Sequence, residues 1–186
     1  MATFYTGPQK TSVEAFFFEQ DQRLLEAFRQ RMEKTNRRAQ LAQVSGIHDE
    51  ALLDRLIELE IGPETLAALA VVPLVYVAWA DGHVHPKERE TIMAAAQAAG
   101  VPSQDGRYPL LEHWLRKKPA PELINAWKDY IKALCKQLDP HGIEELKHDL
   151  LDLAGKVAEA AGGFLGLGKV SAAERARLEE LQQAFS

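Results

Sequence analysis

The chain reads DGHVHPKERETI at residues 81–92 and LGKVSAAERARL at residues 167–178. Both stretches follow the skeleton Gly-x-Val-x-x-x-Glu-Arg-x-x-aliphatic, and each lies between an alanine-rich segment and an amphipathic one. Such a repeat indicates two copies of a helix–turn–helix unit that pack against each other. We therefore predict an all-α fold, a compact helical bundle that contains both copies.

The turns of these copies carry signals that end one helix and begin another. Gly82 can adopt the positive φ that closes a helix, and Asp81 beside it can hydrogen-bond the turn. The segment Ser171-Ala-Ala-Glu174 is a capping box, in which the serine accepts a backbone N–H and the glutamate reaches back. The segment His85-Pro-Lys-Glu88 has the same layout with a poorer cap residue. We interpret both glutamates first as structural caps.

The longest apolar run is TLAALAVVPLVYVAWA, residues 65–80. It is shorter than the roughly 20 residues that span a bilayer, so we read it as a buried central helix and predict no transmembrane segment. Pro73 lacks a backbone N–H and crowds the preceding turn, which predicts a kink or a break there.

Apolar residues at helical spacing predict further helices on both sides of this run. The N-terminal helix carries one apolar stripe, made of Val13, Phe16, Phe17, Leu24, Leu25, Phe28 and Met32. The next helix begins near Asp49 and ends before Gly62. Asp139-Pro140 resembles an N-cap followed by a first-turn proline. The remaining predicted helices cover about 86–99, 110–117, 121–138, 140–161 and the segment from 171, with a loop at 101–108 and a flexible linker at Gly162–Gly168.

Composition limits the class of protein. The 186 residues are 46% apolar, which is enough for one substantial core. With 22 basic and 27 acidic residues the net charge is −5, which argues against a dedicated nucleic-acid binder. The one basic cluster is read as a solvated helix face; its members are Arg29, Arg31, Lys34, Arg37 and Arg38. The single cysteine, Cys135, and an N-terminus without a secretory pattern favour the cytoplasm.

The string from Val77 to Arg89, VAWADGHVHPKER, resembles the Asp-Gly turn and Glu-Arg helix start of TerB-like tellurite-resistance proteins. The resemblance covers about residues 63–185, so we divide the chain into an N-terminal helical extension (1–62) and a TerB-like helical domain (63–186). It implies a compact bundle linked to tellurite resistance or stress responses, found beside chaperone-like and membrane-associated modules, with acidic residues suspected of binding cations. The second turn has Leu167-Gly168 in place of Asp-Gly, which argues against a symmetric pair of cation sites.

A divalent cation is the one cofactor that the residues of the first turn suggest. Asp81, His83, His85 and Glu88 combine carboxylates with imidazoles, which suit such metals. An EF-hand is disfavoured, since that loop needs oxygen donors at alternating positions and a glutamate at the twelfth.

Two functions remain open at this point. We prefer a non-enzymatic interaction module with a protein partner or a homo-oligomeric contact, because the sequence has neither a Gly-x-Ser-x-Gly elbow nor a phosphate-binding Gly-Lys-Ser/Thr loop. The alternative is a cation-binding or cation-sensing protein that uses the Asp81-Gly82 turn. Nucleic acid is an unexpected partner, and peripheral membrane association stays open.

Overall fold

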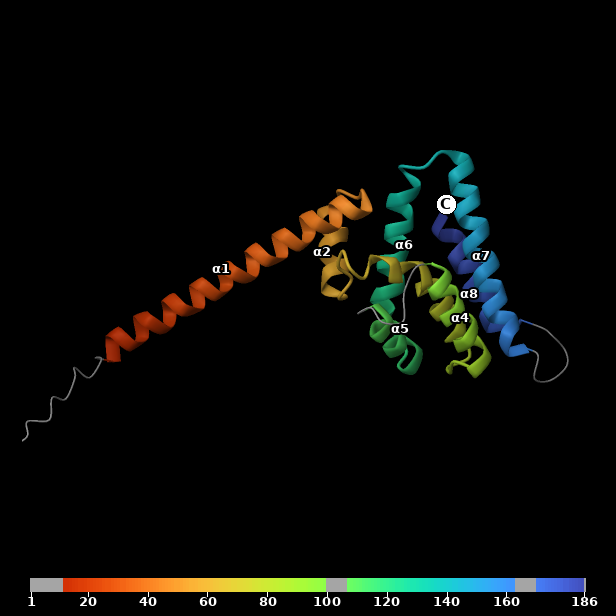
Figure 1. Cartoon of the computed structure of the whole chain (residues 1–186), viewed down its shortest axis with the longest axis horizontal. Helices are drawn as coiled ribbons and strands as arrows, with labels where there is room; N and C mark the ends of the chain where they lie inside the picture. The colour runs from red at the N-terminus through yellow and green to blue at the C-terminus, as the bar shows by residue number, and fades with distance from the viewer. Residues whose placement is uncertain (1–11, 100–106, 163–169, 186) are drawn as a thin grey trace, which may run out of the picture.

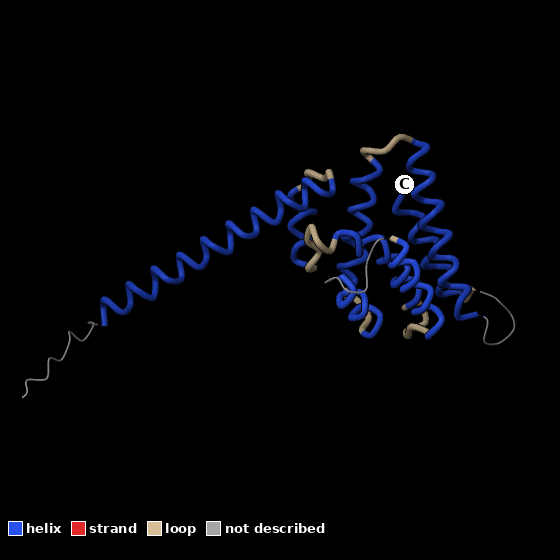
Figure 2. Tube along the Cα trace, in the orientation of Figure 1, coloured by secondary structure: helices blue, strands red, loops and turns tan. Residues whose placement is uncertain are grey.

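The computed structural model describes residues 12–99, 107–162 and 170–185. Within these residues the chain consists of helices joined by turns and loops, without strands, so the predicted all-α fold is confirmed (Figure 2). The helices are α1 (Ser12–Ser45), α2 (Glu50–Glu58), η1 (Leu66–Val71), α3 (Val72–Ala78), α4 (Pro86–Ala98), α5 (Arg107–Arg116), α6 (Pro121–Cys135), α7 (Pro140–Gly162), α8 (Ala172–Gln182) and η3 (Gln183–Phe185).

The central apolar run forms two helices, and the predicted break is confirmed. The 3₁₀ helix η1 ends at Val71 and α3 begins at Val72, so Pro73 lies in the first turn of α3. Proline is tolerated there because its missing N–H would have no intrahelical partner. Every residue from Val71 to Val75 is buried, which places this junction in the core.

The two predicted helix–turn–helix units pack against each other. Helix α7 contacts both α3 and α4, and α8 contacts both α3 and α7. Ala154 and Ala158 are fully buried on α7, one helical turn apart, and small residues at this spacing let a neighbouring helix approach closely. Ile92 and Ala96 of α4 are also fully buried. The turn at Leu167-Gly168 and most of the predicted linker lie outside the described residues.

Helices α2, α5 and α6 complete the core. Leu52, Leu53 and Leu56 of α2 are buried, and α2 contacts α6, whose Trp127 is 1% exposed. Trp114 of α5 is buried as well. One continuous cluster of buried residues runs from Leu41 at the end of α1 through α8 and η3.

Two helix boundaries differ in detail from the prediction. Helix α2 ends at Glu58, and the left-handed φ of 62° belongs to Glu60, not to Gly62. The N–H of Ile61 donates to the carbonyl of Leu56, which stabilises this ending without glycine. Helix α5 begins at Arg107, three residues before the predicted start at Leu110, so the last two residues of the predicted loop are helical.

Helix α1 extends away from the rest of the molecule (Figure 1). It contacts α2 near its C-terminal end, and Leu41 is fully buried there. The described side chains from Glu19 to Glu33 are all exposed. No helix in the described ranges is both long enough and apolar enough to cross a bilayer.

Candidate functional site

An apolar stripe lies exposed on the projecting part of α1. Leu24, Phe28 and Met32 are 66%, 62% and 55% exposed, and Leu25 beside them is 51% exposed. Because the first three are spaced by four residues, they share one face of the helix with Leu25 at its edge. The N-terminal aromatic residues of the predicted stripe have side chains outside the described residues. The part of the stripe that the structure describes therefore faces solvent.

The end of α1 is held by ion pairs with α2. Lys34 Nζ lies 3.5 Å from a carboxylate oxygen of Asp54 and 3.2 Å from one of Glu58. Arg38 lies 3.0 Å from Glu50 and 3.6 Å from Asp54. The hydrogen bond to Glu58 is the main cause that raises the pKa of Lys34. The basic cluster was read as a solvated face, and for Lys34 and Arg38 that reading holds only in part, because both are partly exposed and paired with α2.

The Asp-Gly turn has the predicted local geometry. Gly82 has a φ of 95°, and its N–H donates to the carbonyl of Trp79 at 3.2 Å. The carboxylate of Asp81 accepts the N–H of His83 at 3.4 Å, and His83 Nδ1 lies 3.5 Å from the same oxygen. This turn lies on the surface, since Asp81, Gly82 and His83 are all exposed.

Both predicted capping boxes are confirmed. The carboxylate of Glu88 accepts the N–H of His85 at 2.7 Å, and that of Glu174 accepts the N–H of Ser171 at 2.6 Å. The side chain of each cap residue also accepts a backbone N–H. His85 Nδ1 accepts the N–H of Lys87 at 3.3 Å, and Ser171 Oγ accepts the N–H of Glu174 at 3.1 Å. These bonds satisfy N–H groups that a helix start leaves without partners.

The two capping glutamates are the buried acidic side chains of the described core. Glu88 is 2% exposed and Glu174 is 6% exposed. Burial is the main cause that raises the pKa of Glu88 to about 7; the hydrogen bond from His85 opposes this, while the charges of Asp81 and Glu174 add to it.

The four predicted metal ligands are partly brought together. Asp81 and His83 are adjacent on the surface, whereas the carboxylate of Glu88 is turned into the core as a cap. His85 uses Nδ1 in its own cap. Across the described parts of the chain, no group of three or more His, Cys, Asp or Glu side chains is arranged to hold a metal ion. The cation site stays a hypothesis that rests on Asp81 and His83.

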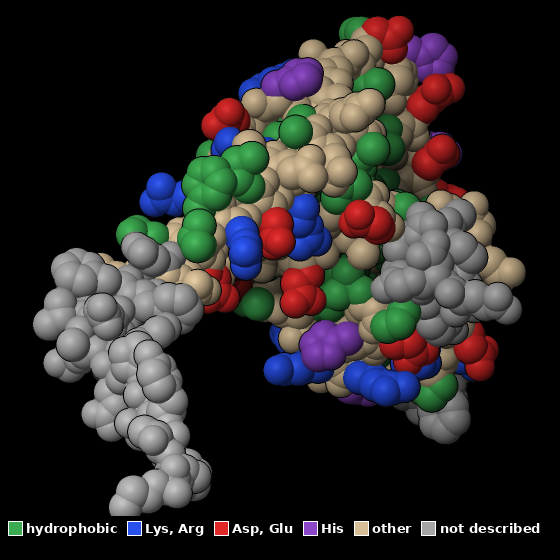
Figure 3. Space-filling view, turned by 60° about the vertical axis from the view of Figure 1, so that its left-hand side comes forward, with side chains coloured by type: hydrophobic (Ala, Val, Ile, Leu, Met, Phe, Trp, Pro, Cys, Tyr) green, Lys and Arg blue, Asp and Glu red, His purple; other side chains and the backbone are tan. Residues whose placement is uncertain are grey.

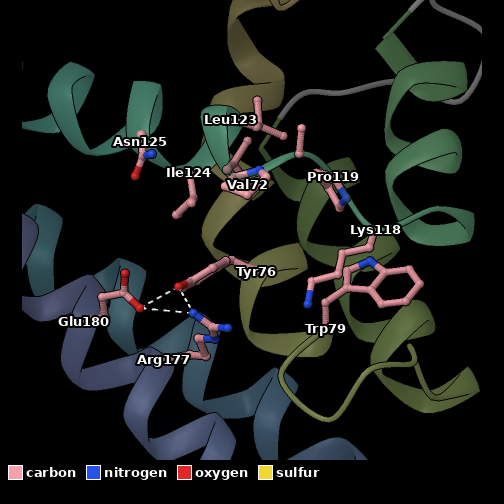
Figure 4. A pocket seen from close by; sticks show the side chains of 12 residues that line it. Val72, Tyr76, Trp79, Lys118, Pro119, Leu123, Ile124, Asn125, Arg177 and Glu180 are labelled. Atoms are coloured by element: carbon pink, nitrogen blue, oxygen red, sulfur yellow. Dashed lines mark hydrogen bonds and ion pairs between the residues drawn. The ribbon is translucent and has the colours of Figure 1, made fainter.

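A cavity of about 240 Å³ opens between α3, α6, α8 and the loop that precedes α6. Figure 4 shows Tyr76, Arg177 and Glu180 toward one end of it, and Trp79 and Lys118 toward the other. Its apolar wall comes from Val72, Leu123 and Ile124. Aromatic, apolar and charged side chains therefore converge on one small space.

One polar cluster at this cavity links α3, α6 and α8. The hydroxyl of Tyr76 donates to Glu180, and Arg177 lies 4.4 Å above the Tyr76 ring and 3.2 Å from Glu180. Lys128 of α6 pairs with the same carboxylate. Burial is the main cause that raises the pKa of Tyr76 to about 12, so this phenol stays protonated near neutral pH. Sequence reasoning missed the cluster, because Tyr76 and Glu180 are 104 residues apart.

Cys135 is only half-buried, so its predicted role as a small core hydrophobe holds only in part. Burial raises the pKa of its thiol, which disfavours the nucleophilic thiolate.

On the face shown in Figure 3, acidic and basic side chains are interspersed rather than gathered into one patch of like charge.

Comparison with known proteins gives no relative: no family model, curated protein or solved structure matches the chain.

Proposed function

We propose that this chain is a non-enzymatic helical interaction module of the TerB-like kind, and that it assembles by pairing α1 with α1 of a second copy. The observation that carries the proposal is the exposed stripe of Leu24, Leu25, Phe28 and Met32 on the projecting helix. An apolar stripe on one helix face is normally buried against a partner.

The length of α1 supports a partner along this helix. At 1.5 Å per residue, its 34 residues extend over about 50 Å. Most of the stability of helices in proteins comes from packing of an apolar face rather than from the helix itself. The segment from Glu19 to Glu33 has exposed side chains throughout its described positions, so the described part of the chain provides no packing against it. A second helix along the stripe would supply that packing.

The charge distribution of α1 favours a second copy in antiparallel orientation. From Ser12 to Ala27 the sequence has four acidic residues and one basic residue, a net charge of 1 − 4 = −3. From Phe28 to Ser45 it has five basic residues and one acidic residue, a net charge of 5 − 1 = +4, although Lys34 and Arg38 are paired with α2. An antiparallel pair centred on Phe28 sets each acidic half beside a basic half. A parallel pair would set like charges together, which opposes association.

The expected affinity is modest. Full burial of a Leu, Phe or Met side chain contributes roughly 1.5–3 kcal/mol. The four stripe residues are already half to one-third covered, so each contributes about 1–2 kcal/mol, or about 8–16 kcal/mol for the eight side chains of a pair. Association costs about 4–15 kcal/mol. Because the free energy gained by burial and the cost of association are of similar size, we expect a dimer that dissociates on dilution.

Sedimentation equilibrium over a range of concentrations tests this pairing. We expect a monomer–dimer equilibrium for the wild type and a monomer for Phe28→Glu, which places a charge at the centre of the stripe. Gln30→Glu is the matched control, because it adds the same charge two positions away, on the opposite side of the helix. A monomeric wild type at every concentration, or equal behaviour of the two variants, contradicts the proposal.

The cellular setting that the resemblance implies is tellurite resistance or a stress response, and it belongs to the same proposal. Growth of a strain that lacks this gene, on medium with and without tellurite, tests it. Unchanged growth under tellurite and under general stress would contradict it.

A divalent-cation site at the Asp81-Gly82 turn is the second candidate. Its support is the pairing of Asp81 with His83 on the exposed turn, at 3.5 Å. Two protein ligands leave most of a coordination sphere to water, so we expect weak binding at best. Melting of metal-stripped protein with and without calcium, magnesium, zinc and manganese tests it.

A further inference from the structure

The cavity between α3, α6 and α8 has the features of a ligand site that is independent of α1. Its aromatic side chains are Tyr76 of α3 and Trp79, the C-cap residue that follows this helix. The indole N–H of Trp79 donates to the carbonyl of Trp114 at 2.9 Å, which fixes this ring. The ring of Tyr76 is fixed by its hydroxyl bond to Glu180 and by Arg177 above it. The aromatic part of the cavity is therefore formed before any ligand arrives.

The charge around the cavity is positive. Lys118 and Arg177 line the cavity and Lys128 pairs with Glu180, the acidic residue of its described lining, so these four side chains carry 3 − 1 = +2. Glu180 is already paired with Arg177 and Lys128. The ammonium of Lys118 has no hydrogen bond or ion pair with any part of the chain that the structure describes. Of the two described basic residues that line the cavity, Lys118 and Arg177, this exposed lysine is the one left for a ligand.

The start of α6 adds to this positive charge. Ala120 is the N-cap of α6 and makes no side-chain hydrogen bond to the helix. Ala120 and Pro121 both line the cavity. An uncapped helix N-terminus carries a partial positive charge and favours a nearby anion. Ala120 lies only two residues from Lys118 in the sequence, and both line the cavity.

We propose that this cavity binds a small organic carboxylate with an aromatic or short aliphatic body. The carboxylate pairs with Lys118 beside the start of α6, and the body packs against Trp79, Tyr76 and the apolar wall. The exposed amide of Asn125 also lines the cavity and offers a hydrogen bond to a polar substituent.

Size and charge narrow the class of ligand. Pockets for drug-sized molecules measure about 300–1,000 Å³, and this cavity of about 240 Å³ is smaller. A single ring or a short chain with one acidic group fits this space. A dianion such as phosphate has no body to fill the apolar wall, and an organic cation would face Lys118 and Arg177.

Isothermal titration calorimetry with four probes tests the proposal on the full chain. Phenylacetate and hexanoate carry both the charge and the body, acetate carries only the charge, and phenylacetamide carries only the body. We expect phenylacetate or hexanoate to bind at least about tenfold more tightly than acetate and phenylacetamide, because each of these loses one of the two contributions.

Two lysine variants locate the charge. Lys118→Gln should weaken phenylacetate binding by about tenfold. Lys117→Gln is the matched control, since Lys117 is an exposed neighbour that does not line the cavity, and it should bind as the wild type does.

Three outcomes with these probes and variants would overturn the inference. The first is the absence of a heat of binding for every probe at millimolar concentration. The second is equal affinity for phenylacetamide and phenylacetate, and the third is an equal effect of the two lysine variants on phenylacetate binding. Tighter binding of a peptide with a free C-terminal phenylalanine than of phenylacetate would also overturn it, since the cavity would then recognise the end of a protein chain. None of these results depends on whether α1 forms a dimer.

Discussion

Replacement of Glu88 by glutamine should change how the stability of the protein depends on pH. The folded protein raises the pKa of this buried carboxyl from its ordinary 4.5 to about 7. One pKa unit corresponds to about 1.4 kcal/mol, so the ionised side chain costs the folded state about 3 kcal/mol above pH 7. The stabilising contribution of the protonated form is complete below pH 4.5 and is lost as pH rises through about 7.

The Glu88→Gln variant keeps a side-chain cap at the start of α4, but it no longer has a carboxyl group that titrates. Its amide oxygen can still accept the N–H of His85, which Glu88 accepts at 2.7 Å. We therefore expect Glu88→Gln and wild type to differ little at pH 5, and the variant to be more stable by about 2–3 kcal/mol at pH 8. Urea unfolding at several pH values measures this difference.

The matched control is Glu90→Gln, which removes one negative charge from an exposed position of the same helix. Its difference from wild type should stay within about 0.5 kcal/mol across the pH range. A Glu88→Gln variant that is equally destabilised at pH 5 and pH 8 would refute the reasoning, because it would mean that the charge of Glu88 carries no burial cost.

Three further predictions concern the turns and one ion pair. Ser171→Ala removes the hydroxyl that accepts the N–H of Glu174, and it should lower the free energy of unfolding in urea by about 1 kcal/mol. An unchanged free energy of unfolding would contradict this. The ion pair of Arg55 and Asp129, at 2.7 Å, joins α2 to α6, and both side chains are nearly half exposed. A double-mutant cycle should therefore give a coupling energy below about 1 kcal/mol. A coupling energy of several kcal/mol would contradict this. If the Asp81 turn is only structural, Asp81→Ala should lower the melting temperature equally with and without divalent cations, whereas a cation-dependent loss would support the metal hypothesis.

Local features of the fold could be predicted from the sequence because the sequence encodes them within a few residues. The capping boxes need only the cap residue and a glutamate three positions later, and both were found as predicted. Pro73 disrupts the helix through its own ring, so the break between η1 and α3 was also predictable. In contrast, the end of α2 depends on the carbonyl of Leu56 accepting from Ile61, and glycine does not mark it.

The cavity and the exposure of α1 could not be predicted, since both depend on how distant segments pack. Tyr76 and Arg177 meet only because α3 contacts α8. An apolar stripe on a helix has the same pattern whether it faces a core or solvent, so the spacing of Leu24 and Phe28 did not reveal that both are exposed. The acidic and basic halves of α1 were visible in the sequence, and their antiparallel complementarity is the signal that would have suggested pairing.

The orientation of two α1 helices can be measured with a spin label at position 40. Gln40 is exposed on α1, and the label would be attached to Gln40→Cys in a chain with Cys135→Ser, so that it is the single thiol. Position 40 lies 12 residues from Phe28, so an antiparallel pair centred on Phe28 separates the two labels by about 36 Å along the helix axis. A pulsed-EPR distance of that order, lost in Phe28→Glu, is the result we predict. A distance near the roughly 10 Å spacing of parallel helices, or no intermolecular distance at all, would contradict the proposed antiparallel assembly.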